Sequence, residues 1–181
     1  MGVGMKMNLI ACALACAISL AAAEIKIDWS KAKNGDQTIP GWVINKYGKT
    51  EGVGSAVLEK GSKEGTFAFS MKGGAHRTSF YQAKRLPVKI GDTVKFSFRM
   101  KGTGSIVIGF YCYDNISFVA KAKDNMKSLT ATAGWQSVTQ EIEIQQPYEA
   151  NRSVKMICPQ ITINPNSNVV IEDLKIEHIS K

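Results

Sequence analysis

Hydrophobic and polar side chains alternate along residues 94–101, and this pattern constrains the fold more than any other feature of the chain. The apolar positions are Val94, Phe96, Phe98 and Met100, and the polar positions between them are Lys95, Ser97, Arg99 and Lys101. Successive side chains of a β-strand point to opposite faces, so a period of two residues buries one face and leaves the other in solvent. Residues 94–101 are therefore predicted to form a half-buried strand.

Similar alternation recurs along the chain, at 67–71, 106–112 and 138–144. Turn-forming residues separate these segments, at 73–74, 91–92, 102–104, 114–115 and 164–168. No stretch of about ten or more residues combines a helical period with capping residues. Short strands without intervening helices predict an all-β protein, built as an antiparallel two-sheet sandwich or a barrel.

Residues 1–23 have the pattern of a secretory signal peptide. An uncharged apolar stretch, 9–23, follows Lys6 and ends in three alanines. This stretch is shorter than the roughly 20 residues that a membrane-spanning helix needs. We therefore expect residues 1–23 to be removed, which leaves a single β-sandwich domain over 24–181 that is secreted, periplasmic or at the cell surface, with no membrane span. An uncleaved membrane anchor and a lipid anchor are the alternatives.

Composition excludes some classes of protein and partner. With 44% hydrophobic and 21% charged residues, the chain is globular rather than disordered. The formal net charge is +8, but no run of five like charges occurs, which favours a scattered, solvated basic surface. Together with secretion, this argues against nucleic acid as a partner.

Two of the four cysteines, Cys112 and Cys158, lie in the predicted domain. Both are assigned to core-facing positions of two different strands. A secretory compartment permits disulfides, so these cysteines either form one or remain two buried free thiols.

Catalytic patterns are absent from the sequence. The two histidines, His76 and His178, are not near a serine or cysteine motif typical of a catalytic triad. Acidic pairs such as Glu141 and Glu143 fit a solvated strand face better than a glycosidase carboxylate pair. We expect no enzyme activity and no cofactor for chemistry.

Five segments occur in an order that is informative as a set: IPGWVINKYG (39–48), GTFAFSMKGG (65–74), SFYQAKRLPVKIGDTVKFSFRMKG (79–102), GWQSVTQEIEI (134–144) and VVIEDLKI (169–176). This order resembles the jelly-roll carbohydrate-binding modules attached to cellulases and xylanases, within the galactose-binding-like superfamily. The resemblance implies a jelly-roll β-sandwich and a non-catalytic module that binds a polysaccharide or oligosaccharide, in association with glycan-degrading enzymes. It also implies packing roles for Trp42 and Trp135. A structural or adhesive protein-interaction domain with this fold and no sugar groove is the alternative.

Tyrosines out of phase with the core are the first candidates for a binding site, because sugar rings stack on aromatic faces. Tyr111 and Tyr113 lie on the opposite parity to the apolar residues of their strand, although a second buried face is an equal alternative. Tyr81 joins them as a candidate on a strand of ambiguous phase. The resemblance implies that Tyr47, which shortly follows the Gly-Trp pair, lines the groove.

Polar and basic candidates complete the predicted site. The resemblance places a polar residue after the Gly-Gly turn, near Arg77. It also implies that amide side chains of the strand 154–163 line the groove. The corresponding positions here carry Lys155, Ile157 and Pro159, with Gln160 next to them. Arg77, Arg99 and Lys155 have parities that could place them on an exposed sheet face. If they share that face with the tyrosines, an acidic polysaccharide is favoured over a neutral glucan.

The closing strand changes phase at Glu172 and Asp173, which predicts a β-bulge. The resemblance implies a structural Ca²⁺ near the chain ends, where Asp173 with Glu64 or Asp28 would supply oxygen ligands. The alternative is that Asp173 satisfies the backbone of the bulge.

Overall fold

The computed structural model describes residues 22–115, 117–119, 125–147 and 152–181, and the regular secondary structure of these residues is almost entirely β-strand. Sheet A contains β1 (Ala22–Glu24), β3 (Ser55–Lys60), β4 (Phe67–Lys72), β7 (Thr93–Thr103), β11 (Gln136–Glu143) and β13 (Asn168–Ile179). Sheet B contains β2 (Trp42–Asn45), β5 (Thr78–Gln82), β6 (Leu86–Pro87), β8 (Ser105–Tyr113), β9 (Phe118–Val119), β10 (Met126–Thr130) and β12 (Met156–Ile163). One 3₁₀ turn, η1 (Trp29–Lys31), follows β1.

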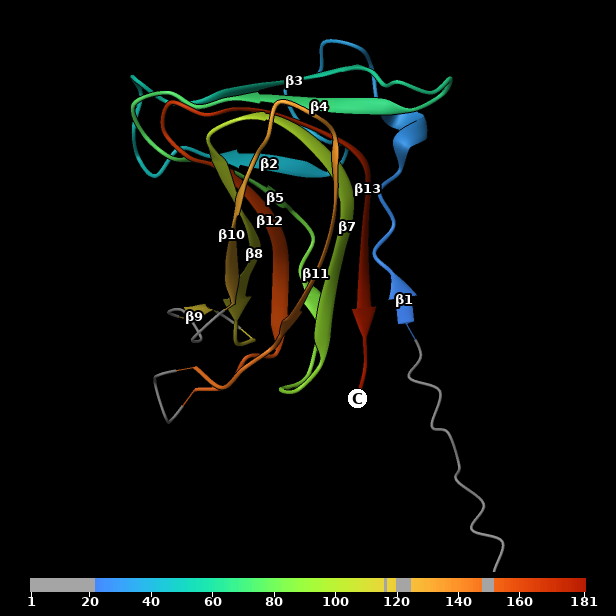
Figure 1. Cartoon of the computed structure of the whole chain (residues 1–181). Helices are drawn as coiled ribbons and strands as arrows, with labels where there is room; N and C mark the ends of the chain where they lie inside the picture. Colours follow the sequence, from blue (N-terminus) through green and yellow to red (C-terminus); the bar gives the residue numbers. More distant parts are fainter. Residues whose placement is uncertain (1–21, 116, 120–124, 148–151) are drawn as a thin grey trace, which may run out of the picture.

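The two sheets are antiparallel, and the chain crosses repeatedly between them. Sheet A has the order β11-β7-β13-β4-β3, with β1 beside β13, and sheet B has the order β10-β8-β12-β5-β2. In sheet B, β6 also pairs with β12 and β9 with β8. Figure 1 shows β1 beside β13 near the C-terminus. This arrangement confirms the predicted all-β, antiparallel two-sheet sandwich.

Most of the predicted signal peptide lies outside the described residues. Ala22 and Ala23, its last two residues, belong to β1 and pair with Ile179 and His178. None of the helical structure in the described ranges has the length and hydropathy needed to cross a membrane.

The core lies between the two sheets and is built by the alternation seen in the sequence. Phe96, Phe98 and Met100 of β7 point inward and are at most 3% exposed. Across the sandwich, Phe69 of β4 and Phe80 of β5 meet edge to face, with ring centroids 5.0 Å apart. Trp42 is 5% exposed and packs in this core, which confirms its predicted packing role.

The predicted β-bulge in the closing strand is present. The register of β13 against β7 shifts between Glu172 and Lys175, and Asp173 has a backbone φ of 56°. A non-glycine residue in this left-handed region is uncommon, and short polar side chains such as aspartate adopt it most readily.

The two cysteines of the domain face opposite sides of sheet B. Cys112 points into the core, whereas Cys158 is paired in register with Tyr111 and faces outward beneath neighbouring side chains. The expectation that both face the core is therefore wrong for Cys158. No disulfide joins Cys112 and Cys158, and burial raises the pKa of Cys158 to about 11, so the Cys158 thiol stays protonated at neutral pH.

Asp92, just before β7, forms hydrogen bonds with residues at the C-terminal end of the chain. Its carboxylate accepts hydrogen bonds from the backbone N–H groups of Lys89 (2.9 Å) and Lys181 (3.3 Å), and lies 2.8 Å from Nε2 of His178. Burial raises the pKa of Asp92, but the hydrogen bonds from Lys89 and His178 outweigh it and hold this pKa below its ordinary value. Asp92 is therefore expected to contribute to stability as a carboxylate.

Asp92→Asn should lower the free energy of unfolding at pH 7 by about 2 kcal/mol, because the amide loses charge-assisted hydrogen bonds. Since the pKa is depressed in the folded state, the carboxylate's contribution is complete above about pH 4 and is lost as pH falls through the folded-state pKa. Urea unfolding of both proteins at pH 7 and pH 3 measures this effect, and the difference between them should narrow at pH 3. An equal difference at the two pH values would contradict the assignment.

Candidate functional site

The outer face of sheet B carries a cleft of about 440 Å³ between the middle of the sheet and the loops at one end of it. Tyr47, Tyr111 and Phe118 line this cleft together with Lys49, His76 and Arg77, and we call it the tyrosine cleft. The alternation of each strand explains its position, because residues of β8 and β5 that face the core alternate with residues that face outward. Phe110 and Phe80 are fully buried, while Tyr111 and Tyr81, one residue further on, lie on the outer face.

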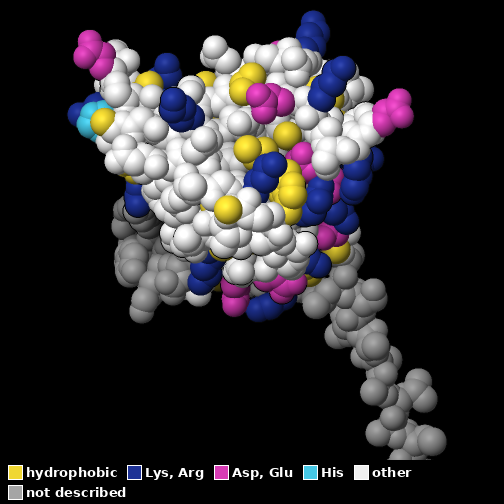
Figure 2. All heavy atoms as spheres, turned by 45° about the horizontal axis from the view of Figure 1, so that its top comes forward, with side chains coloured by type: hydrophobic (Ala, Val, Ile, Leu, Met, Phe, Trp, Pro, Cys, Tyr) yellow, Lys and Arg dark blue, Asp and Glu magenta, His cyan; other side chains and the backbone are white. Residues whose placement is uncertain are grey.

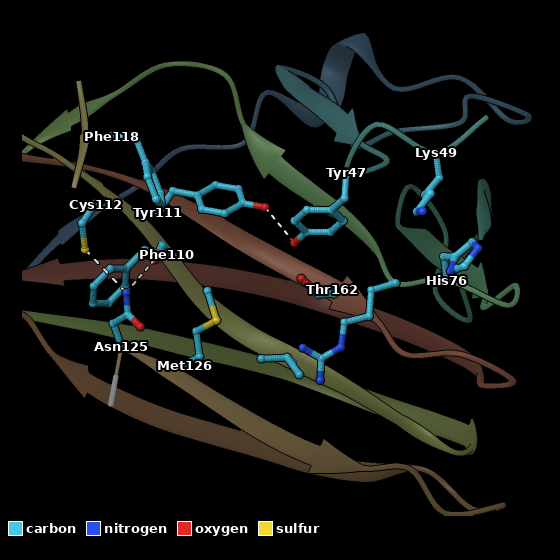
Figure 3. A pocket seen from close by; sticks show the side chains of 12 residues that line it. Tyr47, Lys49, His76, Phe110, Tyr111, Cys112, Phe118, Asn125, Met126 and Thr162 are labelled. Carbon is cyan, nitrogen blue, oxygen red and sulfur yellow. Dashed lines mark hydrogen bonds between the residues drawn. The ribbon is translucent and has the colours of Figure 1, made fainter. Parts of the chain in front are cut away.

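Two phenol hydroxyls meet across the tyrosine cleft. Figure 3 shows Tyr47 and Tyr111 pointing toward each other, and their hydroxyl oxygens are 2.9 Å apart. The Tyr47 hydroxyl also bonds Ser79 Oγ at 2.5 Å, and Asn45 Nδ2 donates to the Tyr111 hydroxyl at 3.2 Å. Ser79 continues the network to Thr162. The hydroxyls of Tyr47 and Tyr111 thus line the cleft and are held in place by a hydrogen-bonded network that continues to the fully buried Ser79.

A tight turn after β2 brings Tyr47 over the sheet. Its backbone has φ of 52°, and its N–H donates to Asn45 Oδ1 at 2.9 Å. An asparagine side chain that accepts a bond from the backbone two residues later is a recognised turn device. Asn45 therefore both shapes the turn that carries Tyr47 and bonds the hydroxyl of Tyr111.

Four aromatic rings form a continuous edge-to-face series on this face. Tyr81 and Tyr111 have centroids 5.2 Å apart, and Phe118 is 5.9 Å from both Tyr111 and Tyr113. Tyr47 and Phe118 are each 48% exposed, so rings on either side of Tyr111 face solvent. Burial raises the pKa values of Tyr111 and Tyr113, which keeps both phenols neutral at physiological pH.

One end of the tyrosine cleft is basic. Lys49 follows β2, and His76 and Arg77 follow the Gly-Gly turn after β4. The turn needs glycine because a Cβ on Gly74 would lie 2.3 Å from the carbonyl oxygen of Gly52. In Figure 3, Lys49 and His76 lie at the opposite end of the cleft from Phe118. Close backbone packing therefore fixes the loop that carries His76 and Arg77.

Gln160 lies on the outer face of sheet B, whereas the positions on either side of it were expected to face the groove. Ile157 and Pro159 face the core, so Gln160 lies on the outer face, opposite Tyr81 and Gly109 in the register. Its side chain is fully buried, with Nε2 3.5 Å from Met126 Sδ, and its Oε1 has no hydrogen-bond partner among the described residues. Gln160 therefore lies beneath this face and is not among the residues that line the tyrosine cleft.

Lys155 and Arg99 do not belong to the tyrosine cleft. Lys155 precedes β12, is exposed and is not among the residues that line the cleft. Arg99 lies on β7 in sheet A, on the other side of the sandwich. Of the three predicted basic residues, only Arg77 lines the cleft.

Arg99 is instead the centre of an ion-pair network on the outer face of sheet A. Its guanidinium is 2.7 Å from Glu172 Oε2 and 3.1 Å from Asp173 Oδ2. Ser62 donates to both carboxylate oxygens of Glu172, from its N–H at 3.0 Å and its hydroxyl at 2.6 Å. Trp135, expected to pack structurally at the mouth of its strand, is 37% exposed, with the Arg99 guanidinium 4.9 Å from its ring centroid.

The residues proposed for calcium do not form a ligand set. Asp173 pairs with Arg99 and with Lys63, whose Nζ is 3.2 Å away, and Asp28 pairs with Lys31 on η1. Glu64 lies in the loop between β3 and β4. No group of three or more His, Cys, Asp or Glu side chains in the described part of the chain is arranged to hold a metal ion. The three carboxylates therefore do not fit a Ca²⁺ ion.

Several residues that line the tyrosine cleft or bond its tyrosines are not among the sequence candidates: Asn45, Lys49, Ser79, Phe118 and Thr162. Ser79 has the parity of Tyr81, so the same alternation could have identified it. Phe118 and Lys49 come from irregular connections, where no periodicity indicates which way a side chain points.

The comparisons with known proteins agree on the fold alone. No family model matches the sequence, and no curated protein matches it. Among solved structures, a cyclase from Fischerella sp. TAU matches with a TM-score of 0.58 and 9% identity over 87% of this chain and 98% of its own. The family 11 carbohydrate-binding module from Clostridium thermocellum matches with a TM-score of 0.53 and 12% identity over 90% and 97%.

The enzymatically active domain of tailspike protein 4 from Bacteriophage CBA120 also matches, with a TM-score of 0.54 and 10% identity over 75% of this chain. This chain corresponds to only 19% of that one. The fold is a jelly roll. Because enzymes and a binding module share it, the fold by itself does not assign an activity.

Proposed function

We propose that the protein is a non-catalytic saccharide-binding module and that its ligand lies in the tyrosine cleft. The observation that carries this proposal is the pair of half-exposed rings, Tyr47 and Phe118, on either side of the Tyr111 hydroxyl. The apolar C–H face of a sugar packs against such rings, while its hydroxyls exchange hydrogen bonds with neutral phenol and amide groups. The hydroxyls of Tyr47 and Tyr111, which lie 2.9 Å apart and line the cleft, suit this second requirement.

The chemistry of the cleft favours binding over catalysis. No Asp or Glu is among the described residues that line it, so the carboxylate pair used by most glycosidases has no counterpart there. The raised pKa of Tyr111 makes that phenol a poor proton acceptor at neutral pH. The fold neighbour from Clostridium thermocellum was solved with a β-1,3-1,4-mixed-linked tetrasaccharide, which supports a saccharide ligand by analogy.

We propose that the protein acts outside the cytoplasm, which the signal-peptide pattern of residues 1–23 supports. As in the modules that the sequence resembles, we propose that binding holds glycan-degrading enzymes close to an extracellular or cell-surface polysaccharide.

Tyr47→Ala and Phe118→Ala should each weaken saccharide binding several-fold, because one stacked ring contributes about 1 kcal/mol. Tyr47→Phe should retain the part of the affinity that stacking supplies. Isothermal titration with a panel of neutral and acidic oligosaccharides measures these effects, after circular dichroism has shown that each variant is folded.

Trp135→Ala is the matched control, because it removes an exposed ring from the opposite sheet and should leave affinity unchanged. A wild-type protein that binds no glycan would contradict the proposal and favour a protein-interaction domain. New reducing ends or unsaturated products during incubation would contradict its non-catalytic part.

A further inference from the structure

We infer that the ligand of the tyrosine cleft is an anionic saccharide, whose carboxylate or sulfate group lies at the basic end beside Lys49 and Arg77. The inference rests on the proposed function and names its substrate class. Three basic side chains, Lys49, His76 and Arg77, line one end of the cleft, and no acidic side chain among the described residues lines it.

The arginines of the chain differ in what their guanidinium groups contact. Arg99 pairs with Glu172 and Asp173, Arg152 pairs with Asp114 at 2.6 Å, and Arg85 lies 4.0 Å from the ring centroid of Tyr113. Within the described ranges, the Arg77 side chain makes no ion pair, hydrogen bond or ring contact, and Lys49 makes none either. These two cations of the cleft are therefore available to an external anion.

Elsewhere the surface charges are mixed. Figure 2 shows basic and acidic side chains interspersed over the visible face. Ion pairs such as Lys63 with Asp173 and Lys181 with Glu143 occupy some of the other lysines. At the end of the cleft, in contrast, the basic side chains lie beside hydroxyl groups that suit a sugar ring.

The chemistry of these groups matches a uronate or a sulfate ester. A guanidinium forms two parallel hydrogen bonds to a carboxylate or sulfate, and a lysine ammonium adds a point charge beside it. The Tyr47 hydroxyl lies between this basic end and Tyr111. A bound residue would therefore place its anionic substituent at the basic end and its ring hydroxyls at the phenols.

The test compares charged and neutral forms of the same saccharide. The probes are uronate oligosaccharides based on galacturonate, glucuronate and mannuronate, each paired with its carboxyl-reduced neutral counterpart, and a sulfated glycan paired with its desulfated form. At low salt, the wild-type protein should bind at least one anionic probe about tenfold more tightly than its neutral partner. This preference should shrink as salt shortens the Debye length below about 8 Å.

The double variant Lys49→Gln/Arg77→Gln should lose about tenfold in affinity for that anionic probe and keep its affinity for the neutral partner. Lys33→Gln/Lys89→Gln is the control, because it changes net charge equally at exposed positions that do not line the cleft. Thermal unfolding confirms that both variants are folded.

The outcomes separate the two proposals. Equal, salt-independent binding of charged and neutral probes, unchanged in the Lys49→Gln/Arg77→Gln variant, would overturn the anionic ligand and leave saccharide binding in place. An equal loss in the control variant would also overturn it, because the effect would then come from net charge. Binding of no probe at all would overturn saccharide binding itself. Preference for uronate or for sulfate identifies which anion the site takes.

Discussion

Replacing Arg99 with alanine is expected to lower the free energy of unfolding by about 3 kcal/mol. The reason is the carboxylate of Glu172, whose side chain is 5% exposed and which would lose its only cationic partner among the described residues. A buried charge left without its partner costs more than the ion pair contributed. The Arg99 side chain is 31% exposed, so entering water relieves part of this cost and the value falls at the lower end of the range for buried pairs.

Saccharide affinity should be unaffected by Arg99→Ala, because the network lies on sheet A and the tyrosine cleft on sheet B. Lys101→Ala is the control, since Lys101 is the next outward residue of the same strand and lies over Trp135 rather than beside a buried carboxylate. Urea unfolding should show a loss of no more than about 1 kcal/mol for this control. Equal losses for the two variants would argue against the network, and weaker glycan binding by Arg99→Ala would restore Arg99 to the site.

Phe69→Ala is expected to cost about 3 to 5 kcal/mol, the largest effect of any single change considered. Phe69 is 1% exposed and meets Phe80 of the other sheet edge to face, with ring centroids 5.0 Å apart. Its loss removes apolar burial, an aromatic contact and the packing that joins the two sheets. Because small domains have only about 5 to 15 kcal/mol of stability, this variant should be close to unfolding.

Guanidinium unfolding of Phe69→Ala, Phe69→Leu and Phe118→Ala measures the effect. Phe69→Leu should lose less, because it retains most of the buried volume. Phe118→Ala removes the same ring from a half-exposed position and should lose about 1 kcal/mol or less. A similar loss of unfolding free energy for Phe69→Ala and Phe118→Ala would show that the packing between the two sheets does not dominate stability.

The sandwich could be predicted because its strands are amphipathic. In β7 every second residue from Val94 to Met100 is apolar, and the structure buries each of them. The outward position of Tyr111 followed in the same way from the inward position of Phe110. Tyr47 and Arg77, placed by resemblance, also line the tyrosine cleft.

The errors arose where alternation is ambiguous or gives no information about the partner strand. In β12, both faces carry buried side chains, with Ile157 and Ile161 on one face and Cys158 and Gln160 on the other. Parity alone therefore does not show which series meets the core, and Lys155 was aligned with the wrong one. Arg99 does face outward, but its parity says nothing about which of the two sheets contains its strand.

Strands, the turns between them and, in amphipathic strands, the side chains that leave the core can be read from the sequence, because these features depend on neighbours a few residues apart. Which outward faces lie together depends on the three-dimensional packing of the strands. Tyr47 meets Tyr111 only because β2 and β8 belong to one sheet, and Arg99 meets Glu172 only because β7 and β13 are paired. Such pairings follow from the packing of the whole sandwich, and local periodicity does not predict them.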